Sequence, residues 1–122
     1  MYREIEKWLD GVLKNAEIPK ETRAFNFNLY EDGDSNWSVE IVATASFDRD
    51  DEDWACDETD NFGTRDNPFC WQEETEWSAV LSKMQSVLTE YLENGRYAGV
   101  LKEYTGVGVG FVDGDIEILY AE

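Results

Sequence analysis

The sequence predicts an α+β domain in which two main helices pack on one face of an antiparallel sheet of four to five strands. Apolar residues recur at helical spacing near the N-terminus and again over residues 75–94. They alternate with polar residues over 23–30 and 37–47, as in half-buried strands. The resulting order of helix, strands, helix and strands is typical of an α+β fold, and 122 residues fit a single domain, 1–122.

The first half of the chain is expected to form a helix followed by a hairpin. Residues 2–16 place Ile5, Trp8, Leu9, Val12 and Leu13 on one helical face. Pro19 then marks the exit from this helix. The strands 23–30 and 37–47 flank a cluster of turn residues, which predicts that they pair antiparallel. Asn26, Asn28 and Tyr30 lie on the polar face of the first strand, which can join a binding surface if the helices cover the other face.

The second half is expected to contain a helix and a closing hairpin. In residues 75–94 one stripe is apolar, and it consists of Trp77, Leu81, Met84, Leu88, Tyr91 and Leu92. Thr75 is a suitable N-cap and Asn94-Gly95 a stop signal. A short helix is expected at 96–103. Residues 106–112 and 115–120 then form strands around a two-residue Asp113-Gly114 turn. Between the hairpins, Trp54, Cys56 and Glu58 are compatible with a short third strand, and Phe69-Cys70-Trp71 with another extended segment.

Charge and composition exclude several classes of function. The chain has 28 acidic and 10 basic residues, a formal net charge of −18, and no histidine. Such a charge repels nucleic acid and anionic membranes and disfavours self-association, so we expect a monomer that binds neither directly. The absence of histidine removes Ser-His-Asp, Cys-His and histidine–metal chemistry. With neither a signal peptide nor a run of about 18 apolar residues, the chain is expected to be cytoplasmic.

The two cysteines, Cys56 and Cys70, are expected to be thiols in a reducing cytoplasm. A disulfide between them is the alternative, and it would close a loop of 15 residues. A catalytic cysteine lacks a histidine to activate it.

An acidic segment carries the main functional signal. Eight carboxylates fall within the thirteen residues 48–60, with Arg49 as the single basic residue among them. Carboxylates at this density repel one another, so the segment either serves a partner or is a solvated loop. We expect a docking surface for a basic protein, with Trp54 as an aromatic anchor ringed by charge; the alternative places Trp54 in the core. The candidate partner-binding residues are Asp50, Asp51, Glu52, Asp53, Trp54, Asp57, Glu58 and Asp60.

Cofactor and catalytic interpretations are weaker. A calcium-binding EF-hand loop beginning at Asp48 would need glycine at its sixth position, where Asp53 stands. The repeat Gly106-x-Gly108-x-Gly110 lacks the helix that follows a nucleotide-binding loop, so it indicates a strand against which another element packs closely. Arg65 is expected to be an internal salt-bridge partner. We therefore expect no cofactor, no metal site and no enzymatic activity.

Taken with these features, the chain resembles the small acidic immunity proteins of bacterial toxin–immunity systems, including contact-dependent growth inhibition and other polymorphic toxins. The resemblance rests on size, a single cytosolic domain, acidic excess and three segments, and it would cover nearly the whole chain. The three segments are Phe25-Asn26-Phe27-Asn28-Leu29-Tyr30, Asp53-Trp54 to Asp57-Glu58, and Gly108-Val109-Gly110-Phe111-Val112-Asp113-Gly114-Asp115.

The resemblance implies a tight complex with one cognate toxin, often a basic nuclease made by a neighbouring gene, and no catalytic residues. The alternative is a nucleic-acid mimic of the antirestriction type, or an acidic adaptor for a basic host protein. A mimic would spread regularly spaced acids along an extended face, whereas this sequence concentrates them in one irregular segment.

Overall fold

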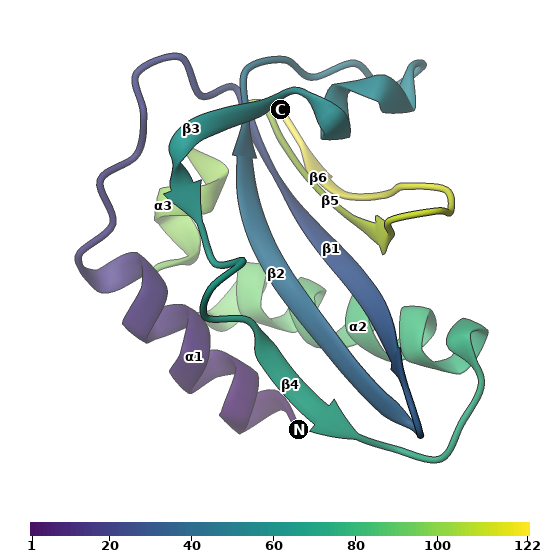
Figure 1. Cartoon of the computed structure of the whole chain (residues 1–122). Coiled ribbons are helices and arrows are strands. Elements are labelled where there is room, and N and C mark those ends of the chain that lie inside the picture. Colours follow the sequence, from purple (N-terminus) through teal and green to yellow (C-terminus); the bar gives the residue numbers. More distant parts are fainter.

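The computed structural model describes residues 1–122, apart from the side chains of Asp60 and Asn61. The chain contains three α-helices and six strands, with one short 3-10 helix, η1, in the acidic segment (Figure 1). In order the elements are α1 (Tyr2–Lys14), β1 (Ala24–Gly33), β2 (Asn36–Thr44), η1 (Glu52–Cys56), β3 (Glu58–Gly63), β4 (Phe69–Gln72), α2 (Trp77–Asn94), α3 (Ala98–Lys102), β5 (Gly106–Phe111) and β6 (Glu117–Ala121).

The sheet is mixed, so the expectation of a purely antiparallel sheet is wrong, although the α+β class is confirmed. Five of its six strands follow the order β3-β2-β1-β5-β6, and the sixth, β4, pairs with β2. β1 and β2 form the expected antiparallel hairpin, whereas β1 and β5 are parallel. The parallel pair arises because α2 and α3 carry the chain from β4 across to β5, so that β5 runs in the same direction as β4. Strands β4 and β1 both run antiparallel to β2, and β5 is therefore parallel to β1.

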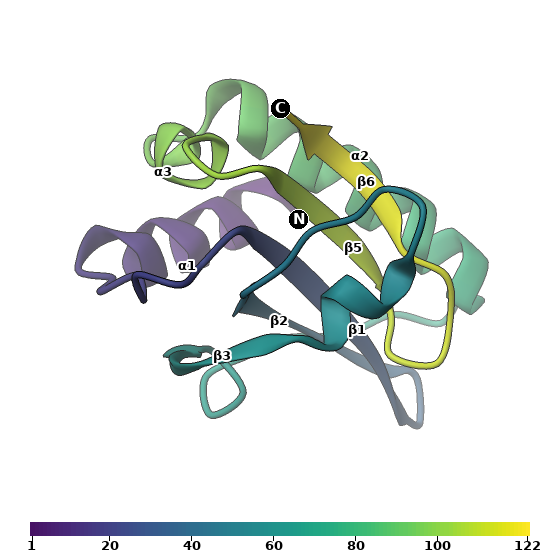
Figure 2. The same cartoon turned by 90° about the horizontal axis from the view of Figure 1, so that it is seen from above.

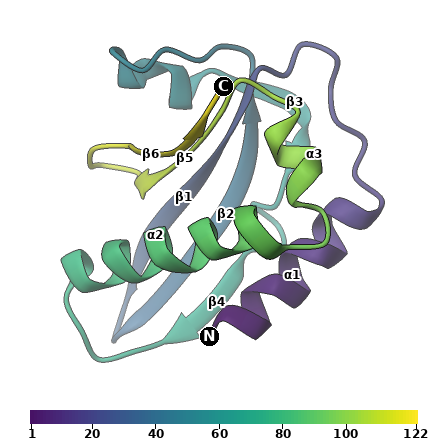
Figure 3. The ribbon, with the colours of Figure 1, turned by 180° about the vertical axis from the view of Figure 1, so that it is seen from behind.

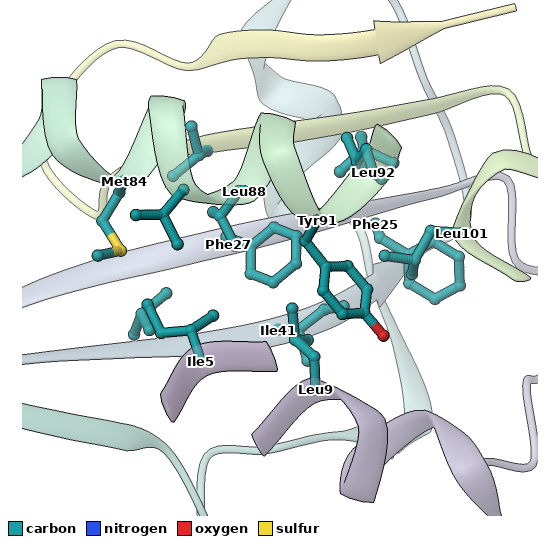
Figure 4. Packing of buried hydrophobic residues seen from close by; sticks show 14 of the residues in the cluster. Ile5, Leu9, Phe25, Phe27, Ile41, Met84, Leu88, Tyr91, Leu92 and Leu101 are labelled. Atoms are coloured by element: carbon teal, nitrogen blue, oxygen red, sulfur yellow. The ribbon is translucent and has the colours of Figure 1, made fainter. Parts of the chain in front are cut away.

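All three α-helices cover one face of this sheet (Figure 3). The main core lies between them and the strands, and it includes Ile5 and Leu9 of α1, Met84 and Leu88 of α2, and Phe27 of β1 (Figure 4). The period of two in each strand directs alternate side chains into this layer. Tyr91 of α2 reaches towards α1, where its hydroxyl donates a hydrogen bond to Asp10 Oδ1 at 2.7 Å. No helix in the described chain is long and apolar enough to cross a membrane.

The opposite face carries a second, smaller core. Trp54 and Ala55 of η1 pack with Ala24, and Phe47, Ile116 and Ile118 lie around them. Figure 2 shows η1, the short helix before β3, on the side of the sheet away from α1 and α2. The acidic segment is therefore a structured cover over the sheet rather than a free loop.

The element boundaries differ from those expected, most clearly in three places. Trp54 and Cys56, which were expected in a short third strand with Glu58, lie in η1, and β3 begins only at Glu58. The β5–β6 connection spans residues 112–116 instead of a two-residue Asp113-Gly114 turn. Helix α2 begins after Glu76, which provides no side-chain cap, and not after Thr75. The β5–β6 connection and the start of α2 lie beside each other, and both line the groove described below.

Glycine 108 in β5 is expected to tolerate no side chain. A Cβ there would lie 2.8 Å from Asn26 Oδ1, 2.9 Å from Ile116 Cγ2 and 3.0 Å from Trp54 Cζ2. We expect Gly108→Ala to lower the free energy of unfolding by about 1–3 kcal/mol through overpacking, as measured by urea denaturation. The matched control is Gly11→Ala in α1, where nothing beyond the adjoining residues and the local helix backbone lies within 4 Å of the added Cβ. That change should stabilise the helix by about 0.5–1 kcal/mol, and equal effects at both sites would contradict the packing argument.

Candidate protein-binding surface

Two aspartates of the acidic segment accept hydrogen bonds from the backbone of the same segment. Asp48 Oδ1 accepts a hydrogen bond from the backbone N–H of Asp50 at 2.9 Å, and Asp51 Oδ1 accepts one from Asp53 N at 3.0 Å. Asp51 is thereby the N-cap of η1, the role for which aspartate is favoured. These local bonds order the backbone while the remaining carboxylate oxygens face water.

Trp54 lies beneath this segment and not on its surface. Its side chain is 3% exposed, and its ring meets that of Phe47 edge-on at a centroid distance of 4.9 Å. The expectation of an exposed Trp54 anchor is therefore corrected to the core alternative. Packing against Ile116 gives Trp54 a structural role, since it fixes the acidic segment to the sheet.

The predicted carboxylates divide into unpaired and paired groups. Asp50, Asp51, Glu52, Asp53 and Asp57 are exposed, and within the described residues none of them is in a salt bridge. Glu58 is different, because its Oε1 lies 3.1 Å from Nη2 of Arg65. The side chain of Asp60 lies outside the described part of the structure. Five of the eight expected residues are therefore exposed carboxylates that form no salt bridge within the described chain.

A polar network on the same face of the sheet was not expected from the sequence. Glu40 of β2 is 1% exposed and accepts hydrogen bonds from Asn28 Nδ2 at 3.1 Å and from the Tyr30 hydroxyl. Arg65 donates to it from Nε at 3.2 Å, which confirms Arg65 as a salt-bridge partner. Asn28 pairs directly with Glu40 across the hairpin, and this cross-strand register is the signal that could have identified the network.

The network predicts a loss of stability at alkaline pH. Burial, followed by the hydrogen bond to Glu40 and the charge of Glu40, raises the pKa of Tyr30 from 10.0 to about 12. A raised folded-state pKa means that this stabilisation is complete below about pH 10 and is lost as the pH rises towards 12. We expect Tyr30→Phe to lower the free energy of unfolding by about 1 kcal/mol at pH 8. The difference from wild type should shrink between pH 10 and 12 in chemical denaturation, and a constant difference would contradict the assignment.

A groove opens where α2 begins beside the β5–β6 connection. It has a volume of about 750 Å³ and includes Trp77, Phe111, Val112 and Asp115 in its lining. Trp77 is 59% exposed, so the expectation that this residue belongs to the apolar core stripe of the helix is wrong. Its position at the first residue of α2 places it at the rim of the sheet rather than over its centre.

Metal-ligating side chains and thiols are the other chemistry-bearing groups of the chain. The described residues contain no group of three or more metal-ligating side chains placed to hold an ion. Cys56 and Cys70 are both exposed free thiols. The described surface also presents the exposed carboxylates on and beside η1 and the groove beside α2. Comparisons with protein-family models, curated proteins and solved structures found no match for this chain.

Proposed function

We propose that this chain is a cytoplasmic immunity protein that binds one basic toxin, of the nuclease class, and neutralises it through the acidic surface. The observation that carries the proposal is the set of five exposed carboxylates on η1 and its flanks, none of which is in a salt bridge within the described chain. The buried Trp54 keeps these charges in a fixed arrangement. A fixed negative surface favours a positively charged protein partner.

The mechanism follows from how a nuclease holds its substrate. Such an enzyme uses lysine and arginine to bind phosphates. Carboxylates held on a preformed surface can occupy those cations and exclude the nucleic acid. The long-range attraction also accelerates encounter, with association rate constants that can reach about 10⁸ M⁻¹s⁻¹ at low salt. The protein acts by binding alone, with no catalytic residue of its own.

Co-expression with the product of a neighbouring gene tests the proposal. A basic protein encoded there should arrest growth when it is expressed alone, and growth should recover when this chain is expressed with it. The purified pair should form a complex of fixed stoichiometry that survives at high salt. Recovery should disappear when Asp50, Asp51, Glu52 and Asp53 are changed to Asn or Gln. If the chain instead binds many nucleic-acid-binding proteins weakly and loses them at high salt, the immunity proposal fails and a nucleic-acid mimic is favoured.

A further inference from the structure

The exposed large hydrophobic side chains of the described residues line the groove beside α2. Trp77 and Val112 are the large hydrophobic residues that stay exposed in the described chain, at 59% and 53%. Both line the same groove, although 35 positions separate them in the sequence. Exposed apolar side chains that converge on one concave surface are typical of a binding site.

Trp77 is connected to the core through contacts with two further aromatic rings. Trp77 meets Phe111 edge-on at a centroid distance of 6.2 Å, and Phe111 meets the buried Trp37 at 6.0 Å. The indole N–H of Trp37 donates a hydrogen bond to the backbone oxygen of Glu73 at 2.9 Å, and this bond fixes the orientation of the Trp37 ring. A supported ring loses little conformational entropy on binding, which is a property of interface hot spots.

The rim of the groove is negatively charged. Glu31, Asp113, Asp115 and Glu117 contribute to the lining, all four are exposed, and no lysine or arginine is among the lining residues. Trp77, Leu81, Phe111 and Val112 are among the apolar residues of the same lining. An apolar floor within a carboxylate rim complements an apolar side chain flanked by cations.

The groove is continuous with the acidic segment through the β5–β6 connection. Ile116 packs against Trp54 below η1, while its neighbours Asp115 and Glu117 line the groove. In Figure 1 the β5–β6 connection lies between η1 and the start of α2. A single partner could therefore contact the acidic segment and the groove together.

We propose that the groove receives one large apolar side chain of the basic partner, carried on a segment in which lysine or arginine flanks that side chain. This inference rests on the proposed function for the partner's identity, and it adds the contact that retains the partner. The acidic segment accelerates association, whereas burial of the apolar side chain against Trp77 slows dissociation. Homodimerisation through the groove is disfavoured, because each copy carries a net charge of −18.

Short blocked peptides with one leucine flanked by lysine and arginine provide a probe that needs no toxin. We expect the leucine peptide to shift the amide signals of Phe111 and Val112 and the indole signal of Trp77 in ¹H–¹⁵N spectra. Trp77→Ala should weaken this binding at least about 10-fold, and so should alanine in place of the peptide leucine. Trp77→Phe should retain most of the affinity, because a ring still covers Phe111. Circular dichroism and the Tm should remain near wild type in both variants, since Trp77 is mostly exposed.

The toxin complex supplies the second measurement. Trp77→Ala and Val112→Ser should each raise its dissociation rate by about 10-fold or more with little change in the association rate. The inference is overturned if the leucine and alanine peptides bind equally, if the shifts fall only on residues 50–57, or if sedimentation shows that this face forms a homodimer. Failure of the chain to neutralise any toxin would overturn the proposed function but leave the peptide result standing.

Discussion

Trp54→Ala is expected to lower the free energy of unfolding by about 3–5 kcal/mol, the range for removing a large aromatic side chain from a core. Trp54 is 3% exposed and fills the space between η1 and the sheet, against Phe47 and Ile116. The substitution removes most of the apolar contact in this second core, so the acidic segment should detach before the main core unfolds. Chemical denaturation measures the stability, and amide hydrogen exchange should show faster exchange first at residues 50–57.

Trp54→Phe is the matched control for this prediction. The indole N–H of Trp54 is buried and has no hydrogen-bond partner among the described groups, so phenylalanine removes an unsatisfied donor. That gain, about 1–3 kcal/mol, opposes the loss of ring volume. We therefore expect a net change of less than about 1.5 kcal/mol. If Trp54→Ala leaves stability unchanged and instead accelerates release of the partner, Trp54 is the surface anchor that the sequence suggested, and the packing described above is wrong.

Hydrophobic periodicity was sufficient to predict α1, the β1–β2 hairpin and α2, because each depends on side chains that are close in sequence. It could not predict the parallel pairing of β1 with β5. That pairing brings Phe27 beside Val109 and depends on which edge of the sheet the chain reaches after α2. The alternation of 106–112 is the same for either strand direction, so the sequence pattern carried no information on this point.

The candidate surface was predictable only in part, for a similar reason. Charge density identified Asp50, Asp51, Glu52 and Asp53 without knowledge of the fold. The sequence pattern favoured an exposed Trp54 and a buried Trp77, whereas Trp54 is buried and Trp77 is exposed. Periodicity gives the side of a helix on which Trp77 lies, but not that the first turn of α2 extends to the rim of the sheet. Trp54 stands among charges, and its burial depends on Ile116, which is distant in sequence.

The burial of Glu40, a polar side chain, could not be predicted from the sequence pattern either. Alternation in β2 places it on the face away from the helices, and the sequence predicts no element that covers this face. Its 1% exposure arises because Tyr30 of β1 and Arg65, which follows β3, meet it from both sides. Neither contact is local in sequence, so an isolated strand pattern would leave Glu40 in water.

Neutralising the acidic segment should slow capture of the partner without weakening the fold. In the variant Asp50→Asn, Asp51→Asn, Glu52→Gln and Asp53→Asn, the association rate constant should fall by about 10- to 100-fold at low ionic strength. Its dependence on salt should also become flatter, because fewer long-range charges remain to be screened. Asparagine at position 51 keeps a side-chain oxygen that can accept from Asp53 N, so η1 should retain its cap. Stopped-flow association over a range of salt concentrations measures both effects.

A second variant with the same change in net charge separates local steering from overall charge. Its substitutions are Glu17→Gln, Glu90→Gln, Glu93→Gln and Glu103→Gln, at exposed positions in or beside the helices. The helices cover the face opposite η1, so this variant changes the field at the acidic segment much less. The acidic-segment variant should therefore associate far more slowly than the control, with the dissociation rate similar in both. If the two variants slow association equally, the partner responds to net charge alone and the acidic segment is not its docking surface.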